Sequence, residues 1–500
     1  MPQNFVPCDR DQQMLMPPDM RGWLPDDHLA WFVIDFVEQI DLAAFYCRHR
    51  DDGWGRAAFD PRMMVTLLLY AYSMGVRSAR EIERRLIQDV AFRVIAANRQ
   101  IDHATVCRFR GRHRDALAEL FVEVLSLCAK AGMVRPGVVA IDGTKLGANA
   151  SAAHNLTRDQ LEELARRVFE EAEDIDARED ELYGDKRGDE LPEHLHERAA
   201  RIEWLRRKLA ERQRELDDQA VHPKSKSNAR VNTTDPDSAL LRTRSGYIQG
   251  YNAQAAVSTD HFVVAADITQ DNNDFAMLRP MVDEVKDNLR AADIDDPLAT
   301  VVADYGYFSD ANAGLEVGVN LLLAPVATSK LPEAVANREP LIEFDEAALR
   351  TAKRERLWGQ RQAARREEIV NAYGAKHITA REAAQVLEVS VAYIYELKWE
   401  AKRLGRSVKT MLPAPPPRPA PTHVMLERFS HPGALATYAM RATTVEPVFG
   451  QLKEARGMRR FLHRGREACR AEWRMMTSAH NLRRLWTCLG ASRPLLVTWA

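Results

Sequence analysis

The spacing of apolar residues changes near residue 137, and this change predicts two kinds of structure. In the preceding segment, apolar positions recur on one side of helical stretches such as RSAREIERRL. The longest apolar run, residues 63–76, is too short and too interrupted to span a bilayer, so it predicts a buried helix. We therefore expect residues 26–135 to form a helical domain that follows an N-terminal tail at residues 1–25.

Beyond this point the apolar residues gather into short runs of strand length. The runs are VVAIDGTKL, YNAQAAVS, FVVAADITQ, LATVVADYGYF and NLLLAPV, and the helical segment NDFAMLRPMVDEVKDNL stands between the third and the fourth. Runs rich in Val, Ala and Leu are typical of a sheet that is buried on both faces. The order of strands and helices therefore predicts an α/β layer fold.

A charged segment at residues 155–220 interrupts the strands after the first run. Acidic and basic residues alternate densely there, as in RRVFEEAEDIDARED and RIEWLRRKLAERQREL. This pattern is typical of helices with solvated faces. We expect a helical hairpin inserted into the sheet domain.

A second insertion is predicted at residues 345–412. The stretch KHITAREAAQVLEVSVAYIYELKWEAKR opens with a capping-box sequence and resembles a helix-turn-helix. Its second helix would offer Tyr393, Glu396 and Lys398 to a DNA major groove. A packed helical hairpin without DNA contact is the alternative. The Pro-rich segment at residues 413–421 predicts a stiff, extended linker.

Composition narrows the class of protein. The chain has 500 residues, a formal net charge of -2, 28% charged and 46% hydrophobic residues, which suits a globular protein of two to four domains. The six cysteines form no C-x-x-C pair, which argues against a zinc ribbon and against a secreted disulfide framework. The start of the chain lacks a basic stretch followed by an apolar one. We therefore expect a cytoplasmic protein.

The signs of the charges are segregated along the chain. Basic residues predominate at residues 77–114 and 441–484, whereas residues 158–219 are acidic. Basic segments near both ends suit a polyanionic partner. The stretch HATVCRFRGRHR holds Arg108 and Arg110, which are candidates to contact phosphates. Surface arginines that only keep a helix solvated are the alternative.

Three acidic residues are candidates for a metal site. Asp142 and Asp304 end two of the strand runs, and acids at strand ends emerge at the edge of a sheet. Glu446 lies in RATTVEPVFGQLK, and Lys453 falls within about 20° of the same helical face. Two aspartates and a later glutamate indicate a carboxylate site for Mg²⁺, and two such ions can support phosphoryl transfer.

Each acid also has a structural alternative. A single aspartate at a strand end is often a turn or cap residue. Thr443 stands three residues before Glu446, so T-T-V-E fits a capping box in which Pro447 occupies the first helical turn. A cap would need no lysine further along the helix.

Taken in order, these motifs resemble a DDE transposase of bacterial insertion sequences, from the group with a Y-R-E-K signature on the last catalytic helix. The matching stretches are FDPRMMVTLLLYAYSMGVRSAREIERRL, HATVCRFRGRH, AIDGTKLGANAS, NTTDPDSALLRTRSGYIQGYNAQAAVS, VVADYGYFS and YAMRATTVEPVFGQLKEARGMRRFLHRG. The resemblance implies an α/β RNase H-like catalytic domain at residues 136–330 and 430–490. This domain would contain a mixed five-stranded sheet flanked by helices. An all-α N-terminal domain that binds DNA would precede it.

The resemblance also implies the chemistry. Asp142, Asp304 and Glu446 would be catalytic and would bind two Mg²⁺ or Mn²⁺ ions. These ions would activate water, and later a 3′-hydroxyl, for attack on phosphodiester bonds at transposon ends and then at target DNA.

The signature implies three further DNA contacts. Tyr438, Arg441 and Lys453 would contact the backbone of the transposon end. Two residues separate Tyr438 from Arg441, and six separate Glu446 from Lys453, as the signature requires. Four residues instead of three separate Arg441 from Glu446, so this chain departs from the pattern at the arginine.

The implied partners are double-stranded DNA, as inverted repeats and as target, and a second copy of the chain in a homodimeric synaptic complex. The implied location is the cytoplasm, in association with the nucleoid and with no membrane. A catalytically inactive or domesticated DNA-binding regulator is the alternative function. The intact set of three acids with Lys453 favours the active enzyme.

Overall fold

The structure, a computed structural model, describes most of the chain. The described residues are 19–47, 58–183, 193–219, 229–243, 245–338, 373, 379–387, 391, 394–395, 399 and 421–490. The chain divides into two compact units, residues 1–329 with 432–500 and residues 330–431. Among the described residues, no helix is both long and apolar enough to cross a membrane.

The N-terminal part of the larger unit is helical. Its elements are η1 (Met20–Trp23), α1 (Leu29–Gln39), α2 (Ala43–Tyr46), α3 (Pro61–Ser73), α4 (Ala79–Gln88), α5 (Val90–Ile95), α6 (His103–Arg112) and α7 (Arg114–Lys130). Asp60 caps α3 by accepting a hydrogen bond from the backbone nitrogen of Arg62, and Pro61 stands in the first turn. Every residue of α3 from Met64 to Ser73 is buried. The longest apolar run therefore forms a core helix, as expected.

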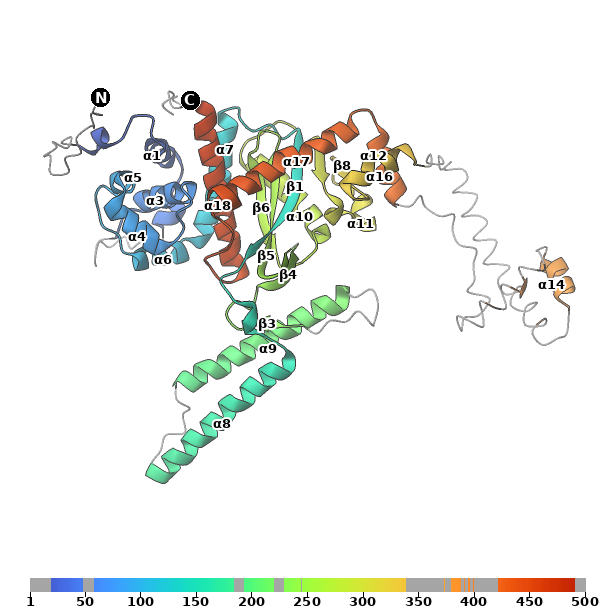
Figure 1. The fold of residues 1–500 in the computed structure, drawn as a ribbon, viewed down its shortest axis with the longest axis horizontal. Coiled ribbons are helices and arrows are strands. Elements are labelled where there is room, and N and C mark those ends of the chain that lie inside the picture. The colour runs from blue at the N-terminus through green and yellow to red at the C-terminus, as the bar shows by residue number, and fades with distance from the viewer. Residues whose placement is uncertain are drawn as a thin grey trace, which may run out of the picture. The chain divides into compact units, whose positions relative to one another are not determined.

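The larger unit also contains a mixed six-stranded sheet (Figure 1). Its strands are β1 (Val138–Gly147), β4 (Ala239–Thr243), β5 (Gly246–Ser258), β6 (Val263–Thr269), β7 (Thr300–Ala303) and β8 (Asn320–Leu323). The order is β4-β5-β1-β7-β8, and β6 also pairs with β5. β5 is antiparallel to β1, β4 and β6, whereas β7 is parallel to β1 and β8. The five apolar runs correspond to β1, β5, β6, β7 and β8.

β4 is the strand that the apolar runs do not predict. It pairs with the first residues of β5, and β6 pairs with the later residues along the same edge. The sheet therefore has six strands, although the resemblance implies five. The sequence of β4, ALLRT, alternates buried and exposed positions and ends in polar residues, so no continuous apolar run marks it.

Helices pack on the sheet and join it to the N-terminal helices. α10 (Leu278–Ala291) follows η5 (Phe275–Met277) and contacts β5 and β6, and α17 (Ala434–Gly450) contacts β1, β5 and β7. α18 (Arg466–Leu489) packs against β6 and also against α3 and α7. A buried ion pair, Arg77 Nη1 to Glu472 Oε1 at 2.9 Å, links the start of α4 with α18. The helical part and the sheet consequently share one core.

Two long helices form within the charged segment. α8 (Arg158–Tyr183) and α9 (Glu193–Gln219) lie between two short paired strands, β2 (Asn155–Leu156) and β3 (Val231–Asn232). They pack through Leu161, Ala165, Val168, Ile202, Leu205 and Leu209. Charged residues cover their remaining faces, as in the ion pair between Arg198 and Glu171 at 2.6 Å.

The smaller unit is described in part. Its described helices are α12 (Leu331–Ala336), α14 (Ala380–Leu387) and α16 (Pro421–Ser430). Thr379 and Glu382 form the expected capping box, since the Thr379 nitrogen donates to Glu382 Oε2 at 2.7 Å and the Glu382 nitrogen donates to Thr379 Oγ1 at 3.3 Å. Tyr393, Glu396 and Lys398, which the helix-turn-helix reading assigns to the major groove, lie outside the described residues, as does almost all of the Pro-rich linker.

Candidate active site

Asp142 and Asp304 follow matching positions of two neighbouring strands. The parallel register of β1 and β7 ends with Ile141 opposite Ala303, and each acid comes directly after its partner in that last pair. β1 continues to Gly147 by pairing with β5. The expectation that Asp142 ends a strand is therefore wrong, because Asp142 stands within β1. Neighbouring strands of a sheet lie about 5 Å apart, so this register brings the two acids close together. We therefore treat their carboxyl groups as one site.

The two acids are partly buried beside one arginine. Arg441 Nη1 donates to Asp142 Oδ2 at 2.6 Å, and their side chains are 12% and 18% exposed. Burial raises the pKa of Asp142 to about 7, the Arg441 charge opposes this rise, and Asp304 adds to it. Burial likewise raises the pKa of Asp304, again with Arg441 opposing. Buried carboxylates with raised pKa values beside each other are typical of functional sites.

α17 and the π-helical turn after it (Gln451–Ala455) bring two more signature residues to this region. Lys453 Nζ donates to Thr144 Oγ1 at 3.0 Å. Thr144 lies two residues after Asp142, so both side chains point to the same face of β1. Tyr438 is 3% exposed. Its hydroxyl lies 3.3 Å from the Oγ1 atom of Thr328, the first residue of the 3-10 turn η7 (Thr328–Lys330).

Glu446 is exposed on α17 and does not join the two aspartates. It follows Arg441 by five residues, which turns it about 140° around an α-helix from the residue that pairs with Asp142. The capping alternative does not hold, because α17 begins at Ala434 and both Thr443 and Pro447 lie inside it. Within the described part of the chain, no three His, Cys, Asp or Glu residues gather closely enough to hold a metal ion.

The aspartate pair still fits a divalent cation. Mg²⁺ is usually bound through one or two carboxylates, with water and substrate phosphates as the other ligands. Asp142 and Asp304 supply two carboxylates at one edge of the sheet, and both are held in a site where a cation would relieve the cost of ionising them.

Asp274 is a further acid at this site that the sequence reasoning missed. Its Oδ1 accepts hydrogen bonds from Asn252 Nδ2 at 2.7 Å and Gln254 Nε2 at 2.8 Å. Its charge adds to the rise in the pKa values of Asp142 and Asp304. In the sequence, Asp274 is only visible as an acid in QDNNDFAML, between a predicted strand and a predicted helix. Acids at such positions are commonly helix caps, so this one did not indicate a functional site.

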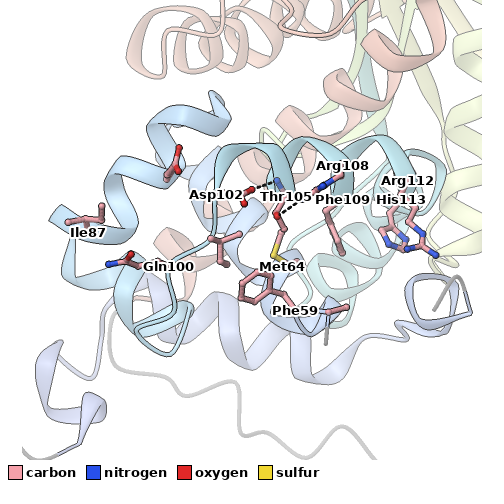
Figure 2. Close-up of a pocket in the computed structure, with 13 residues that line it drawn as sticks. Phe59, Met64, Ile87, Gln100, Asp102, Thr105, Arg108, Phe109, Arg112 and His113 are labelled. Carbon is pink, nitrogen blue, oxygen red and sulfur yellow. Dashed lines mark hydrogen bonds between the residues drawn. The ribbon is translucent and has the colours of Figure 1, made fainter. Parts of the chain in front are cut away.

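The two predicted arginines of the N-terminal helices differ in exposure. Arg108 and Arg112 line a cavity of about 680 Å³ between α3, α4 and α6, and Arg108 Nη2 donates to Thr105 Oγ1 at 3.0 Å (Figure 2). Arg108 is exposed. Arg110 is 7% exposed, and its guanidinium carbon lies 5.5 Å from the ring centroid of Tyr72. Arg108 can therefore reach a phosphate on the surface, whereas Arg110 packs in the interior.

A mixed sheet with two adjacent, partly buried aspartates beside Arg441 and Lys453 is a candidate site for phosphoryl transfer. The comparisons with known proteins agree with this class. The model of a "Transposase domain (DUF772)" matches residues 18–112, and the model of a "Transposase DDE domain" matches residues 416–486. Both matches support a transposase function and agree with the resemblance to a DDE transposase of insertion-sequence type. No curated protein and no solved structure gives a significant match.

The matched segments contain most of the predicted contact residues. The DDE-domain match includes Tyr438, Arg441, Glu446 and Lys453. The other match includes Arg108 and Arg110.

Proposed function

We propose that the protein is the transposase of a bacterial insertion sequence. In this proposal it binds the inverted repeats at the transposon ends and catalyses metal-dependent DNA strand cleavage and strand transfer. The observation that carries the proposal is the register of β1 and β7, which sets Asp142 beside Asp304 at one edge of the sheet. The two transposase matches support the same reading.

We further propose that the sheet domain is RNase H-like. Its support is the strand order β6-β5-β1-β7-β8, in which antiparallel pairs on one side of β1 meet parallel pairs on the other. Asp142 lies on the central strand of this order, and Asp304 follows its parallel neighbour. The two acids thus lie where the antiparallel half of the sheet meets the parallel half, and ligands of α/β sheets commonly bind at such a point, beside the carboxyl ends of the strands.

The roles of the acids follow from their placement. Asp142 and Asp304 would hold Mg²⁺ or Mn²⁺, with Glu446 as the third carboxylate. Bound metal of this kind lowers the pKa of a water and stabilises the charge that develops on a phosphoryl group. Partial burial raises the pKa values of the two aspartates, and a cation beside them would offset this cost of ionisation.

Arg441 and Lys453 would bind the DNA backbone beside the acids. In the present structure Arg441 neutralises part of the charge on Asp142. With a cation held by Asp142 and Asp304, the Arg441 guanidinium would be available for a bidentate contact to a phosphate. Glu446 lies about 140° from Arg441 around α17, so it would reach the two aspartates only if α17 turned about its axis.

The partners and location in the proposal come from the resemblance. The substrate would be double-stranded DNA, as transposon ends and as target, held by a homodimer in the synaptic complex. The place of action would be the bacterial cytoplasm, at the nucleoid.

A second candidate function is a DNA-binding regulator that has lost catalysis. The exposed position of Glu446 favours it, since Glu446 does not stand with Asp142 and Asp304, and no group of three His, Cys, Asp or Glu residues in the described part of the chain is placed to hold a metal ion. This regulator would bind the same DNA ends without cutting them.

One experiment separates the two. The purified protein is incubated with the DNA that flanks its own gene, and protection and nicking are mapped with and without Mg²⁺. The transposase proposal expects protection of matched inverted repeats and nicks at their ends only with Mg²⁺. It also expects that Asp304→Asn binds but does not cut, while Asp310→Asn, an exposed change at the start of α11 (Asp310–Ala313), does both.

Protection without nicking by the unaltered protein would establish the regulator. Equal cutting by Asp304→Asn would show that the aspartate pair is not the catalytic site.

A further inference from the structure

We propose that Asp274 is a positioning residue, which locks together the two segments that carry Asp142 and Asp304. The activity readouts below rest on the proposed transposase function. The inference itself comes from a hydrogen-bonded network around the Asp274 carboxylate that spans three separate segments of the chain.

The first part of the network joins Asp274 to β5. Asp274 follows the end of β6 by five residues and immediately precedes η5. Its Oδ1 accepts two amide hydrogens, from Asn252 at 2.7 Å and from Gln254 at 2.8 Å. These two residues alternate along β5 and therefore point to one face. In the register with β1, Gln254 stands opposite Gly143, the residue directly after Asp142.

The second part is steric. A Cβ atom on Gly143 would lie 2.5 Å from Asp274 Oδ1, and a Cβ atom on Gly306 would lie 3.0 Å from Asp274 Oδ2 and 3.0 Å from Asp304 Oδ1. The Asp274 carboxylate therefore occupies the space left by the missing side chains of both glycines. Gly143 follows the first acid by one residue, and Gly306 follows the second by two. One carboxylate thus bridges the two acid-bearing segments.

The third part closes the network on the Asp304 side. The Tyr307 hydroxyl donates to Gln254 Oε1, and Tyr307 is fully buried. Asn312 Nδ2 donates to the Phe275 oxygen at 2.7 Å and to the Tyr307 oxygen at 2.7 Å. The turn after Asp304 is therefore hydrogen-bonded to Gln254, whose amide also donates to Asp274, and to the backbone of Phe275, the residue after Asp274.

This arrangement fixes the separation of Asp142 from Asp304. Without the Asp274 oxygens, the amides of Asn252 and Gln254 lose their acceptor and a gap opens between the two glycines. Residues that orient metal ligands through hydrogen bonds commonly change metal affinity by about 10- to 100-fold when replaced. An asparagine keeps an acceptor oxygen and nearly the same volume, whereas an alanine keeps neither.

The test compares Asp274→Ala, Asp274→Asn, Gln254→Ala and the exposed control Asp287→Ala. Mn²⁺ binding to the DNA-free full chain is measured by titration calorimetry, and the Mn²⁺ dependence of strand cleavage is measured in parallel. We expect Asp274→Ala and Gln254→Ala to weaken Mn²⁺ binding by about tenfold or more. We expect Asp274→Asn to stay within about threefold of the unaltered protein, and cleavage at saturating Mn²⁺ to change less than the Mn²⁺ concentration needed for half-maximal rate.

Each outcome decides the inference. Unchanged Mn²⁺ binding in Asp274→Ala overturns it, and so does equal weakening in Asp274→Asn and Asp274→Ala, because the residue would then act by its charge. If Asp274→Ala does not fold, Gln254→Ala decides by the same titration. If the unaltered protein binds Mn²⁺ and never cuts DNA, the proposed function fails while the calorimetry still tests the positioning role.

Discussion

Replacing Asp142 by asparagine should stabilise the metal-free protein, and the gain should depend on pH. Burial raises the pKa of Asp142 from 3.8 to about 7 in the folded chain, so the folded state holds this proton to a higher pH than the unfolded state does. The unfolded chain therefore binds fewer protons between these values, and the free energy of unfolding falls as pH rises through them.

The size of the effect follows from the two pKa values. Each pH unit between the two pKa values costs about 1.4 kcal/mol, so the raised pKa lowers the free energy of unfolding by about 4 kcal/mol at pH 8, where Asp142 is ionised in both states, and by about 1 kcal/mol at pH 4.5, where only the unfolded chain is ionised. Asparagine carries no charge and avoids this cost. Asp142→Asn should consequently raise the free energy of unfolding by about these amounts at the two pH values.

The assay is urea unfolding in EDTA, followed by tryptophan fluorescence at pH 4.5 and pH 8. Asp287→Asn is the matched control, because its side chain is 67% exposed. It should change stability by less than about 0.5 kcal/mol at both pH values. A gain for Asp142→Asn that is equal at both pH values, or absent at pH 8, would refute the raised pKa of Asp142 in the folded protein.

Three further predictions concern other parts of the molecule. A Cβ atom on Gly250 would overlap the backbone of β1, so Gly250→Ala should lower the free energy of unfolding by about 2 kcal/mol or more in thermal or urea unfolding. Gly111 lies in α6 with open space around it, so Gly111→Ala should raise the free energy of unfolding by about 0.5–1 kcal/mol. Equal stability of the Gly250 and Gly111 variants would contradict the close β1–β5 contact. Burial lowers the pKa of His480 from 6.5 to about 3, so the unfolded chain takes up a proton first as pH falls, and His480→Gln should remove about 2 kcal/mol of the stability lost between pH 7 and pH 5. An unchanged pH slope would show that the residue is not buried as a neutral group. Arg108→Ala should weaken DNA binding and reduce its salt slope by about one, whereas Arg110→Ala should leave the slope unchanged and lower stability, as its 7% exposure requires; the reverse result would exchange their roles.

The sheet could be predicted from the sequence because its strands are buried on both faces. β6 is buried at every position, and a strand of that kind appears as a continuous apolar run. β4 could not be found in this way, since its positions alternate and its pairing partner is the exposed start of β5. Its formation depends on a register that only the folded β5 provides.

The helix that carries Glu446 shows how tertiary packing can override a local pattern. T-T-V-E-P has the sequence of a helix start, and a proline in a helix interior removes a hydrogen bond. α17 nevertheless runs through Pro447, with Val445 and Val448 buried on either side of it. Packing against the sheet supports this continuation, and such packing is invisible in the local sequence.

The candidate site could be predicted only as far as strand order determines it. Each acid directly follows the last parallel pair of β1 and β7, and this register places Asp142 with Asp304, although Asp142 itself lies within β1. The contact of Asp274 with Gly143 and Gly306 joins residues from three distant segments, and no spacing in the sequence encodes it. The glycines themselves gave no signal, because glycine after an acid is also the ordinary composition of a turn.

The rate of DNA strand cleavage by the Glu446→Gln variant tests most directly whether Glu446 acts with Asp142 and Asp304 as a third catalytic carboxylate. The protein is incubated with Mg²⁺ and the DNA ends that its unaltered form protects, next to a Glu454→Gln control whose side chain is 62% exposed. We predict that Glu446→Gln folds and protects the ends normally but cuts at least about a hundredfold more slowly, and that Glu454→Gln cuts at the normal rate. Equal cutting by Glu446→Gln and the unaltered protein would contradict a catalytic role for the third acid.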